Sequence, residues 1–280
     1  MTTIIFKKEC RTDTPEYSIC MPIYNQEAII NNVLDGIINN TGGTYEITLV
    51  LDACSDNTQQ NVMSWVNSLC YIENLFCITI FKTNEPLFET RADNVCFKNS
   101  RGKYLLEIQA DMVMTQPNYN IHMKKPFDIM ENVIGVSGRL GYNWSTNEGV
   151  GKLGASLNKP LSEDCDVNVF HVCESVARGP LLLNSEKAKC VGYLDEDKYW
   201  LDGDDHDFFA RAYYKHGFIC GYVPIEFVSD LSWGNTRKAR DDVNTTAYNQ
   251  LKQDKPHHML FLEEFYKNKP PRPIYEIALK

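Results

Sequence analysis

The chain has 280 residues, of which 43% are hydrophobic and 23% are charged, a composition typical of a globular protein with a buried core. Its 28 Lys and Arg residues stand against 37 Asp and Glu residues, and the formal charge of −9 disfavours a general nucleic-acid-binding protein, which normally presents a basic face. The ten cysteines include no C-x-x-C pair, so a zinc ribbon or a thioredoxin-type site is unsupported.

Targeting segments are not evident. The N-terminus lacks the apolar stretch of a signal peptide, and no apolar run reaches the roughly 18 residues needed to span a bilayer. Cys20, Cys77 and Cys220 lie within apolar runs, where a reduced cysteine packs as a small hydrophobic residue. We therefore expect a soluble protein of a reducing compartment, the cytoplasm, without a transmembrane segment.

The first 111 residues predict a β-α-β-α-β-α-β order. Each predicted strand is a short hydrophobic run, as in a parallel sheet that is covered by helices on both faces. Neither G-x-G-x-x-G after the first strand nor G-x-x-x-x-G-K-[ST] occurs, so a dinucleotide fingerprint and a P-loop are both missing. The predicted strands are residues 17–22, 46–51, 77–81 and 103–109, and the predicted helices lie within 25–41, 55–69 and 89–100.

Beyond Pro117 the pattern loosens. We expect strands at 132–139, 181–183 and 218–223, and a helix with Phe208, Phe209, Ala212 and Tyr213 on its apolar side that ends at Gly217. The polar region from 143 to about 166 reads as a long loop or short helices, which in a compact domain is usually functional or disordered. The tail is basic at 237–240, helix-like at 259–265 and then proline-rich.

A single acid ends the fourth predicted strand. Asp111 follows the apolar run that begins at Leu105. Ligands of an open α/β sheet lie beyond the carboxyl ends of its strands, where an Asp can hold a divalent cation that bridges phosphates. The alternative is a strand-end Asp that caps the following turn.

Asp52 occupies the same position after the second predicted strand, with Ser55 and Asp56 just beyond it. A carboxylate there can accept a hydrogen bond from the imide N–H of uracil or from a ribose hydroxyl. The alternative is an Asx turn followed by a helix cap.

Arg91 begins a predicted helix that should lie beside the same crevice. The planar guanidinium fork suits phosphate oxygens and keeps its charge at every physiological pH. The alternative is a solvent-exposed side chain that pairs with Glu89 or Glu85.

Four acids, Asp202, Asp204, Asp205 and Asp207, lie ahead of the helix that carries Phe208. Crowding raises the proton affinity of carboxylates and favours a general base near neutral pH. A structural explanation is also open, because acids suit the first turn of a helix and Asp207 can pair with Arg211. The six histidines are scattered, and the adjacent His257 and His258 are expected on the surface.

Four segments, in order, resemble the glycosyltransferases of family 2, which have the GT-A fold. They are residues 18–27 (SICMPIYNQE), 49–58 (LVLDACSDNT), 102–111 (GKYLLEIQAD), and 203–208 (GDDHDF) together with Arg211 and Gly217. The resemblance implies an α/β fold with a doubly wound, mostly parallel sheet, helices on both faces and a loop-rich acceptor half. It also implies one domain, with a nucleotide-binding half at about 17–115, an acceptor and catalytic half at about 116–233, and a C-terminal extension at 234–280.

The same resemblance implies roles for individual residues. Asp111 would be the last acid of a D-x-D motif and ligate Mn²⁺ or Mg²⁺, while Asp205, beside Asp204, would take the proton from the acceptor hydroxyl. Nucleotide-sugar contacts would come from Pro22, Tyr24 and Glu27 at the base, Asp52 at the uracil, Arg91 at the diphosphate, Gln109 and Ala110 in the motif, and Arg178 and Gly179 near the sugar.

Two departures affect these roles. Gln109 replaces the first acid of the D-x-D motif, and residues 228–233 offer Asp230 or Ser232 where many relatives have a His. Our leading hypothesis is an inverting transfer of a sugar from a UDP-sugar to a hydroxyl of an unidentified glycan, protein or small-molecule acceptor. The alternative is a GT-A-shaped binding protein without turnover. A nucleotidyltransferase would need a glycine-rich basic loop after the first strand, and residues 22–26 (PIYNQ) are neither.

Overall fold

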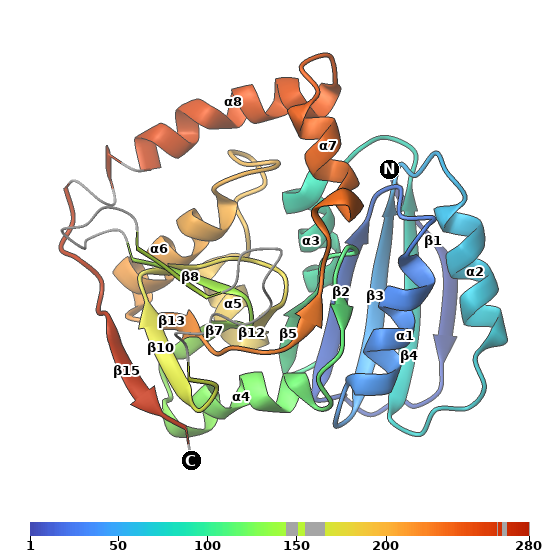
Figure 1. The fold of residues 1–280 in the computed structure, drawn as a ribbon, viewed down its shortest axis with the longest axis horizontal. Helices are drawn as coiled ribbons and strands as arrows, with labels where there is room; N and C mark the ends of the chain where they lie inside the picture. The colour runs from blue at the N-terminus through green and yellow to red at the C-terminus, as the bar shows by residue number, and fades with distance from the viewer. Residues whose placement is uncertain (144–150, 155–165, 262, 265–267, 280) are drawn as a thin grey trace.

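The computed structural model describes residues 1–143, 151–154, 166–261, 263–264 and 268–279 (Figure 1). Its main element is a ten-stranded sheet that runs through both halves of the molecule. The strands, in their order across the sheet, are β1 (Thr2–Glu9), β4 (Leu75–Thr83), β3 (Tyr45–Asp52), β2 (Tyr17–Ile23), β5 (Tyr104–Glu107), β12 (Leu181–Asn184), β7 (Val133–Ser137), β13 (Ile219–Tyr222), β10 (Val169–Cys173) and β15 (Tyr275–Ala278).

Most of these strands run in one direction. β2 pairs in parallel with β3 and β5, β3 with β4, and β7 with β13. Three strands are reversed: β12 between β5 and β7, β10 between β13 and β15, and β1 at the edge beside β4. The predicted α/β class with a mostly parallel sheet is therefore confirmed.

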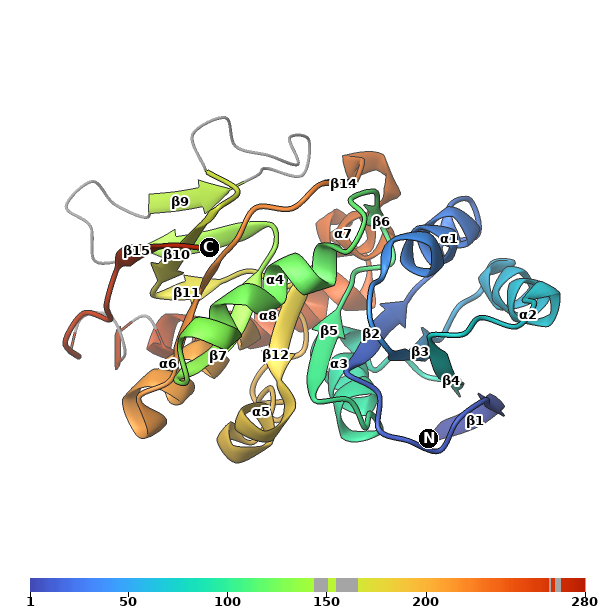
Figure 2. The same cartoon turned by 90° about the horizontal axis from the view of Figure 1, so that it is seen from below.

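Helices cover both faces of the sheet, as Figure 2 shows for α1 and α4 on one side and α3, α5 and α6 on the other. Alternate residues of each strand separate into two cores: Ile19 and Met21 pack with the first group, whereas Cys20 packs with the second. One face carries α1 (Ile30–Asn40), α2 (Thr58–Ser68) and α4 (Tyr119–Ile129), and the other carries α3 (Phe88–Lys98), α5 (Ser185–Val191) and α6 (Asp204–His216).

The chain order explains why both faces are hydrophobic. Every residue of β3 is buried, with Ile47, Leu49 and Leu51 in the first core and Val50 in the second. Burial of a Val, Leu or Ile side chain contributes about 1.5–3 kcal/mol, and β3 gains this on both faces at its four aliphatic positions, Ile47, Leu49, Val50 and Leu51. The continuous apolar runs of the sequence are thus the direct cause of the two-faced packing.

Several elements were not predicted. The edge strand β1 has an exposed, irregular pattern without clean alternation, and α4 contains Pro126, which normally argues against a helix. The region predicted as a long loop or short helices, residues 143 to about 166, lies mostly outside the described part of the chain. Two short strands near it are described, β8 (Leu140–Asn143) and β9 (Gly151–Gly154). β8 pairs with β9 and with β11 (Ser175–Val176), and a separate pair joins β6 (Val113–Met114) to β14 (Phe227–Val228).

The C-terminal segment crosses back over the molecule (Figure 1). A short 3₁₀ helix (Leu231–Trp233) leads into α7 (Asn235–Asp241), which is followed by α8 (Thr246–Phe261). The side chain of Gln26, after β2, donates to the carbonyl of Trp233 at 2.9 Å, and Asp254 of α8 accepts from the backbone N–H groups of Trp200 and Leu201. This segment is therefore attached to both halves of the chain. None of the helices in the described residues combines the length and hydrophobicity needed to cross a bilayer.

Candidate active site

A cavity of about 650 Å³ lies at the carboxyl ends of the central strands. Its volume is in the range of small-molecule sites, and its position is the one where open α/β sheets bind ligands. Asp52, Asp111 and Asp205 all line it, although they come from three distant parts of the chain. Pro22, Tyr24, Gln109, Ala110 and Arg178 line it too, so most of the predicted site residues share one cavity.

Asp52 fixes one wall of this cavity. Its Oδ1 accepts from the Thr83 hydroxyl at 2.9 Å and from the backbone N–H of Leu87 at 2.7 Å, and its Oδ2 accepts from the N–H of Phe88 at 3.0 Å. Burial raises the pKa of Asp52, while these hydrogen bonds act in the opposite direction. The carboxylate thus anchors the segment before α3, whose Pro86 and Phe88 also line the cavity.

Asp111 faces the cavity just beyond β5. Its side chain is 9% exposed, and its Oδ2 lies 3.9 Å from the Nη2 of Arg237 on α7. Burial raises the pKa of Asp111, and the charges of Arg237 and Arg139 lower it. The neighbouring Gln109 accepts from the Nη1 of Arg139 at 3.3 Å and donates to the Oε1 of Glu89 at 3.2 Å.

Asp204 and Asp205 form the first turn of α6. Asp204 is buried, and its Oδ2 accepts from the hydroxyl of Thr90 at 2.6 Å. Asp205 lines the cavity with its side chain 16% exposed, and its Oδ1 accepts from the N–H of His206 at 2.8 Å. Burial raises the pKa of Asp205 above that of an ordinary aspartate, as a general base requires.

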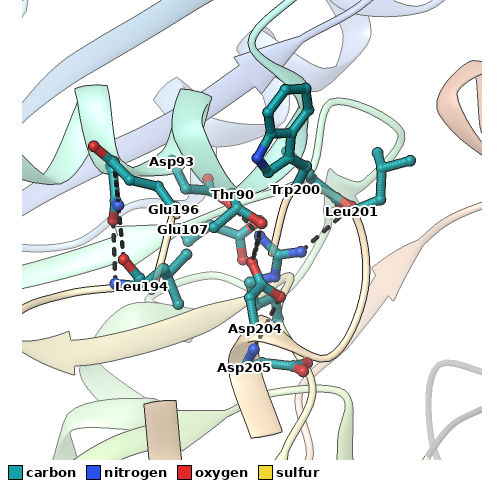
Figure 3. Close-up of polar contacts among 12 residues, drawn as sticks. Thr90, Asp93, Glu107, Leu194, Glu196, Trp200, Leu201, Asp204 and Asp205 are labelled. Carbon is teal, nitrogen blue, oxygen red and sulfur yellow. Dashed lines mark hydrogen bonds and ion pairs between the residues drawn. The ribbon is translucent and has the colours of Figure 1, made fainter. Parts of the chain in front are cut away.

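Arg178 is surrounded by carboxylates beneath the cavity. Its guanidinium lies 2.5 Å from the Oδ2 of Asp93, 3.2 Å from the Oδ2 of Asp204 and 3.3 Å from the Oε2 of Glu89. Figure 3 shows Thr90, Asp93 and Glu107 gathered around the start of α6, with Asp204 turned into the cluster. Because its positive charge is already matched, Arg178 is suited to hold these carboxylates rather than to bind a phosphate.

Glu107 is part of the same cluster and ends β5. Its Oε2 accepts from the backbone N–H of Gly179, and burial raises its pKa to about 7. Gly179 has a φ of +60°, and a Cβ at this position would lie 2.5 Å from the Cγ of Gln109. The glycine therefore allows the close packing of the 178–180 turn against the segment that carries Asp111.

The model of glycosyl transferase family 2 matches residues 18–160, just over half of the chain. The chain belongs to glycosyl transferase family 2. An uncharacterized glycosyltransferase of Rickettsia prowazekii (strain Madrid E) is 26% identical to it over 194 residues, which are 68% of this chain and 57% of that relative. This family-2 chain thus spans less than two thirds of the curated relative.

Solved structures of low sequence identity confirm the GT-A fold. A mannosyltransferase of Pyrobaculum calidifontis in complex with GDP-Man and Mn²⁺ has a TM-score of 0.58 at 17% identity, and the match covers 92% of this chain and 72% of that protein. S. aureus TarS 1-349 in complex with UDP has a TM-score of 0.54 at 14% identity, with 91% and 73% covered.

Arg91 and Glu27 do not lie where the resemblance to family 2 placed them. The guanidinium of Arg91 stacks on the ring of Trp200, 3.7 Å from its centroid, and its Nε donates to the carbonyl of Glu196, so it does not line the cavity. The Oε2 of Glu27 accepts from the N–H of Asn57 at 2.9 Å, at the start of α2, and borders a smaller adjoining hollow. The ring of Trp200 holds Arg91 away from the cavity, and the backbone N–H of Asn57 holds Glu27 away from it.

Several lining residues of this family-2 chain were not singled out from the sequence. Arg139 follows β7 and Arg237 lies on α7, and both line the cavity. The position of Arg139 at the end of a predicted strand could have indicated it, whereas only the basic run at 237–240 pointed to Arg237. His206 also lines the cavity, donates to or accepts from the Ser175 hydroxyl at 2.7 Å, and has its pKa lowered to about 3 by burial. It therefore stays neutral beside Asp205.

The residues around Asp111 do not fit a divalent-cation site well. Gln109 stands in place of an acid, and its carbonyl oxygen is engaged by Arg139. The described residues contain no group of three or more His, Cys, Asp or Glu side chains arranged to hold a metal ion. The charges of Arg237 and Arg139 act on Asp111, and so does the carboxylate of Glu89, which also lines the cavity but is paired with Arg178. A cation site would require further oxygen ligands.

Proposed function

We propose that this chain transfers a sugar from a UDP-sugar to an acceptor hydroxyl with inversion at the anomeric carbon. The observation that carries the proposal is the presence of Asp205, with its raised pKa, in the same cavity as Asp52 and Asp111. Membership of family 2 supports the reaction class, and the UDP complex of TarS supports the donor class. We further propose that the two halves and the C-terminal segment act as one domain, since all three contribute to the cavity.

Each step can be assigned to residues of the chain. Pro22, Tyr24 and Asp52, which line the cavity, would hold the base and the ribose. The carboxylate of Asp205 removes the proton from the acceptor hydroxyl while the acceptor oxygen attacks the anomeric carbon, on the side opposite the leaving diphosphate. Arg178 and the N–H of His206 hold the acidic turn in place. A divalent cation would supply charge stabilisation to the diphosphate, but because the residues at Asp111 fit one poorly, no step is derived through it.

The test is turnover. The protein is incubated with UDP-GlcNAc, UDP-glucose, UDP-galactose and GDP-mannose, with and without Mn²⁺, and release of nucleoside diphosphate is measured with a panel of acceptors. Asp205→Asn should reduce transfer about 10²–10⁴-fold, the usual contribution of a general base, while UDP binding stays within a few fold of the unmodified protein. Asp197→Asn, an exposed acid outside the cavity, is the matched control.

The binding-protein alternative is favoured by Gln109, which removes an acid from the D-x-D motif. It predicts nucleotide-sugar binding without release of UDP under any of these conditions. Full activity of Asp205→Asn would instead remove the base assignment and leave the reaction class intact.

A further inference from the structure

Two arginines from separate elements converge on the D-x-D region. Arg139 lies between β7 and β8, and Arg237 lies on α7 in the C-terminal segment. Arg139 donates to Gln109, which occupies the position of the first acid of the D-x-D motif. Arg237 lies 3.9 Å from the carboxylate of Asp111. Both residues line the cavity in which the diphosphate of a donor would lie.

Both guanidinium groups retain unused donors. Within the described part of the chain, the Nη1 of Arg237 and the Nε of Arg139 are buried without a hydrogen-bond partner. A buried donor without an acceptor is costly, and its persistence at a cavity points to a ligand that supplies acceptor oxygens. Arg178 differs, because three carboxylates within 3.3 Å already match its charge.

The chain makes room for the Arg237 side chain. A Cβ at Gly234 would lie 2.7 Å from the Nη1 of Arg237 and 3.3 Å from the Oδ2 of Asp111. Asn235 donates to the carbonyl of Asn25, which holds the start of α7 against the loop after β2. The attachment of α7 thus sets the Arg237 guanidinium over Asp111.

We propose that Arg139 and Arg237 bind the diphosphate of the donor in place of a divalent cation, so that nucleotide binding by this chain does not require a metal. A guanidinium fork matches phosphate oxygens and carries a permanent charge. The two groups also meet the charge that develops on the leaving diphosphate, the task that a bound cation performs elsewhere. The inference rests on the proposed function and makes α7 part of the donor site.

The first experiment measures UDP and GDP binding by calorimetry, once in EDTA and once in Mn²⁺. Equal affinity, within about threefold, supports the arginine site. Binding in Mn²⁺ alone overturns it and leaves the proposed function standing. Absence of binding in both buffers overturns the proposed function together with the arginine site.

Variants of the two arginines then locate the contact. Hydrogen bonds to charged groups carry enough energy for Arg237→Ala or Arg139→Ala to weaken UDP binding in EDTA by about 10- to 100-fold. Lys255→Ala, which removes an exposed charge from α8 of the same C-terminal segment, outside the cavity, should leave UDP affinity unchanged. Unchanged affinity in both arginine variants, each shown by circular dichroism to be folded, would overturn the proposal.

The direction in which Asp111→Asn changes UDP affinity distinguishes a cation site from an arginine site. If Asp111 holds a cation, loss of its charge removes nucleotide binding. If the arginines bind the diphosphate, the substitution removes a nearby negative charge, and UDP affinity in EDTA should be retained within about threefold or increase. Loss of UDP binding in EDTA by the folded Asp111→Asn variant would count against the proposal.

Discussion

The Nη2 of Arg237 lies 3.9 Å from the Oδ2 of Asp111, which brings a residue of the C-terminal segment next to the acid that follows β5. This pairing joins the first half of the chain to the C-terminal segment at the cavity. It also places a cation beside the one acid that the D-x-D region retains. The cavity is therefore lined in part by a segment that the family-2 match, residues 18–160, does not include.

Gly234→Ala should weaken UDP binding without removing any charge. The added methyl would lie 2.7 Å from the Nη1 of Arg237 and 3.3 Å from the Oδ2 of Asp111, so the guanidinium must shift from its present position. We expect a loss of affinity smaller than that of Arg237→Ala, about 3- to 10-fold, because the displaced side chain still carries its charge. Calorimetric titration with UDP measures it, and an affinity equal to that of the unmodified protein would show that the position of Arg237 is unimportant.

The rate of transfer should fall at acid pH because Asp205 becomes protonated. Burial raises the pKa of this carboxyl above its ordinary value of 3.8, and only its deprotonated form can accept a proton. As the pH falls through the raised pKa, kcat/KM should decrease, with an acid limb displaced upward from that of an exposed aspartate. Measuring UDP binding over the same pH range separates chemistry from binding. A rate independent of pH below neutrality would argue against Asp205.

Arg178→Ala should destabilise the fold strongly. The substitution leaves Asp93, Asp204 and Glu89 without their shared cation, and removal of one partner of a buried ion pair costs about 3–5 kcal/mol. Urea denaturation measures the free energy of unfolding. Arg211→Ala, which breaks the pair with Asp207 and two hydrogen bonds to backbone carbonyls, is the comparison and should cost less, because it leaves one carboxylate without its cation and not three. Equal effects would mean that the buried cluster is not specially dependent on Arg178.

Glu107 should make stability decrease as the pH rises. Burial raises its folded-state pKa from 4.5 to about 7, so between these values the folded protein binds more protons than the unfolded chain. Its contribution is therefore fully present below pH 4.5 and is lost as the pH rises through about 7. Glu107→Gln should flatten this part of the profile of unfolding free energy against pH. A variant with the slope of the unmodified protein would assign the slope to another group.

Asp52→Asn should reduce stability as well as UDP affinity. The carboxylate accepts three hydrogen bonds from Thr83, Leu87 and Phe88, and an amide has one oxygen to offer them. A buried donor left unpaired costs about 1–3 kcal/mol. Thermal denaturation and UDP titration of the same variant distinguish the roles: weaker binding at unchanged stability would mean that Asp52 contacts the nucleotide but does not anchor the wall.

The order of elements in the first half was predictable because each buried strand is a continuous apolar run bounded by turn residues. The observed β2, β3, β4 and β5 correspond to the four predicted strands. Strand-end positions then indicated Asp52 and Asp111, because parallel strands end at one edge. The pairing of Asp207 with Arg211 at 2.6 Å was equally local, since i and i+4 positions adjoin on a helix.

Partners distant in sequence could not be predicted in this way. Arg91 was expected at the diphosphate, but its guanidinium stacks on the ring of Trp200. The pairing of Arg178 with Glu89 likewise depends on packing between segments distant in sequence. The sequence by itself determined the α/β layering, because hydrophobic periodicity is a local property. The tertiary structure decided which arginine side chains lie near Asp111. The position of α7, which carries Arg237, depends on hydrogen bonds between residues far apart along the chain, such as Asn235 and Asn25.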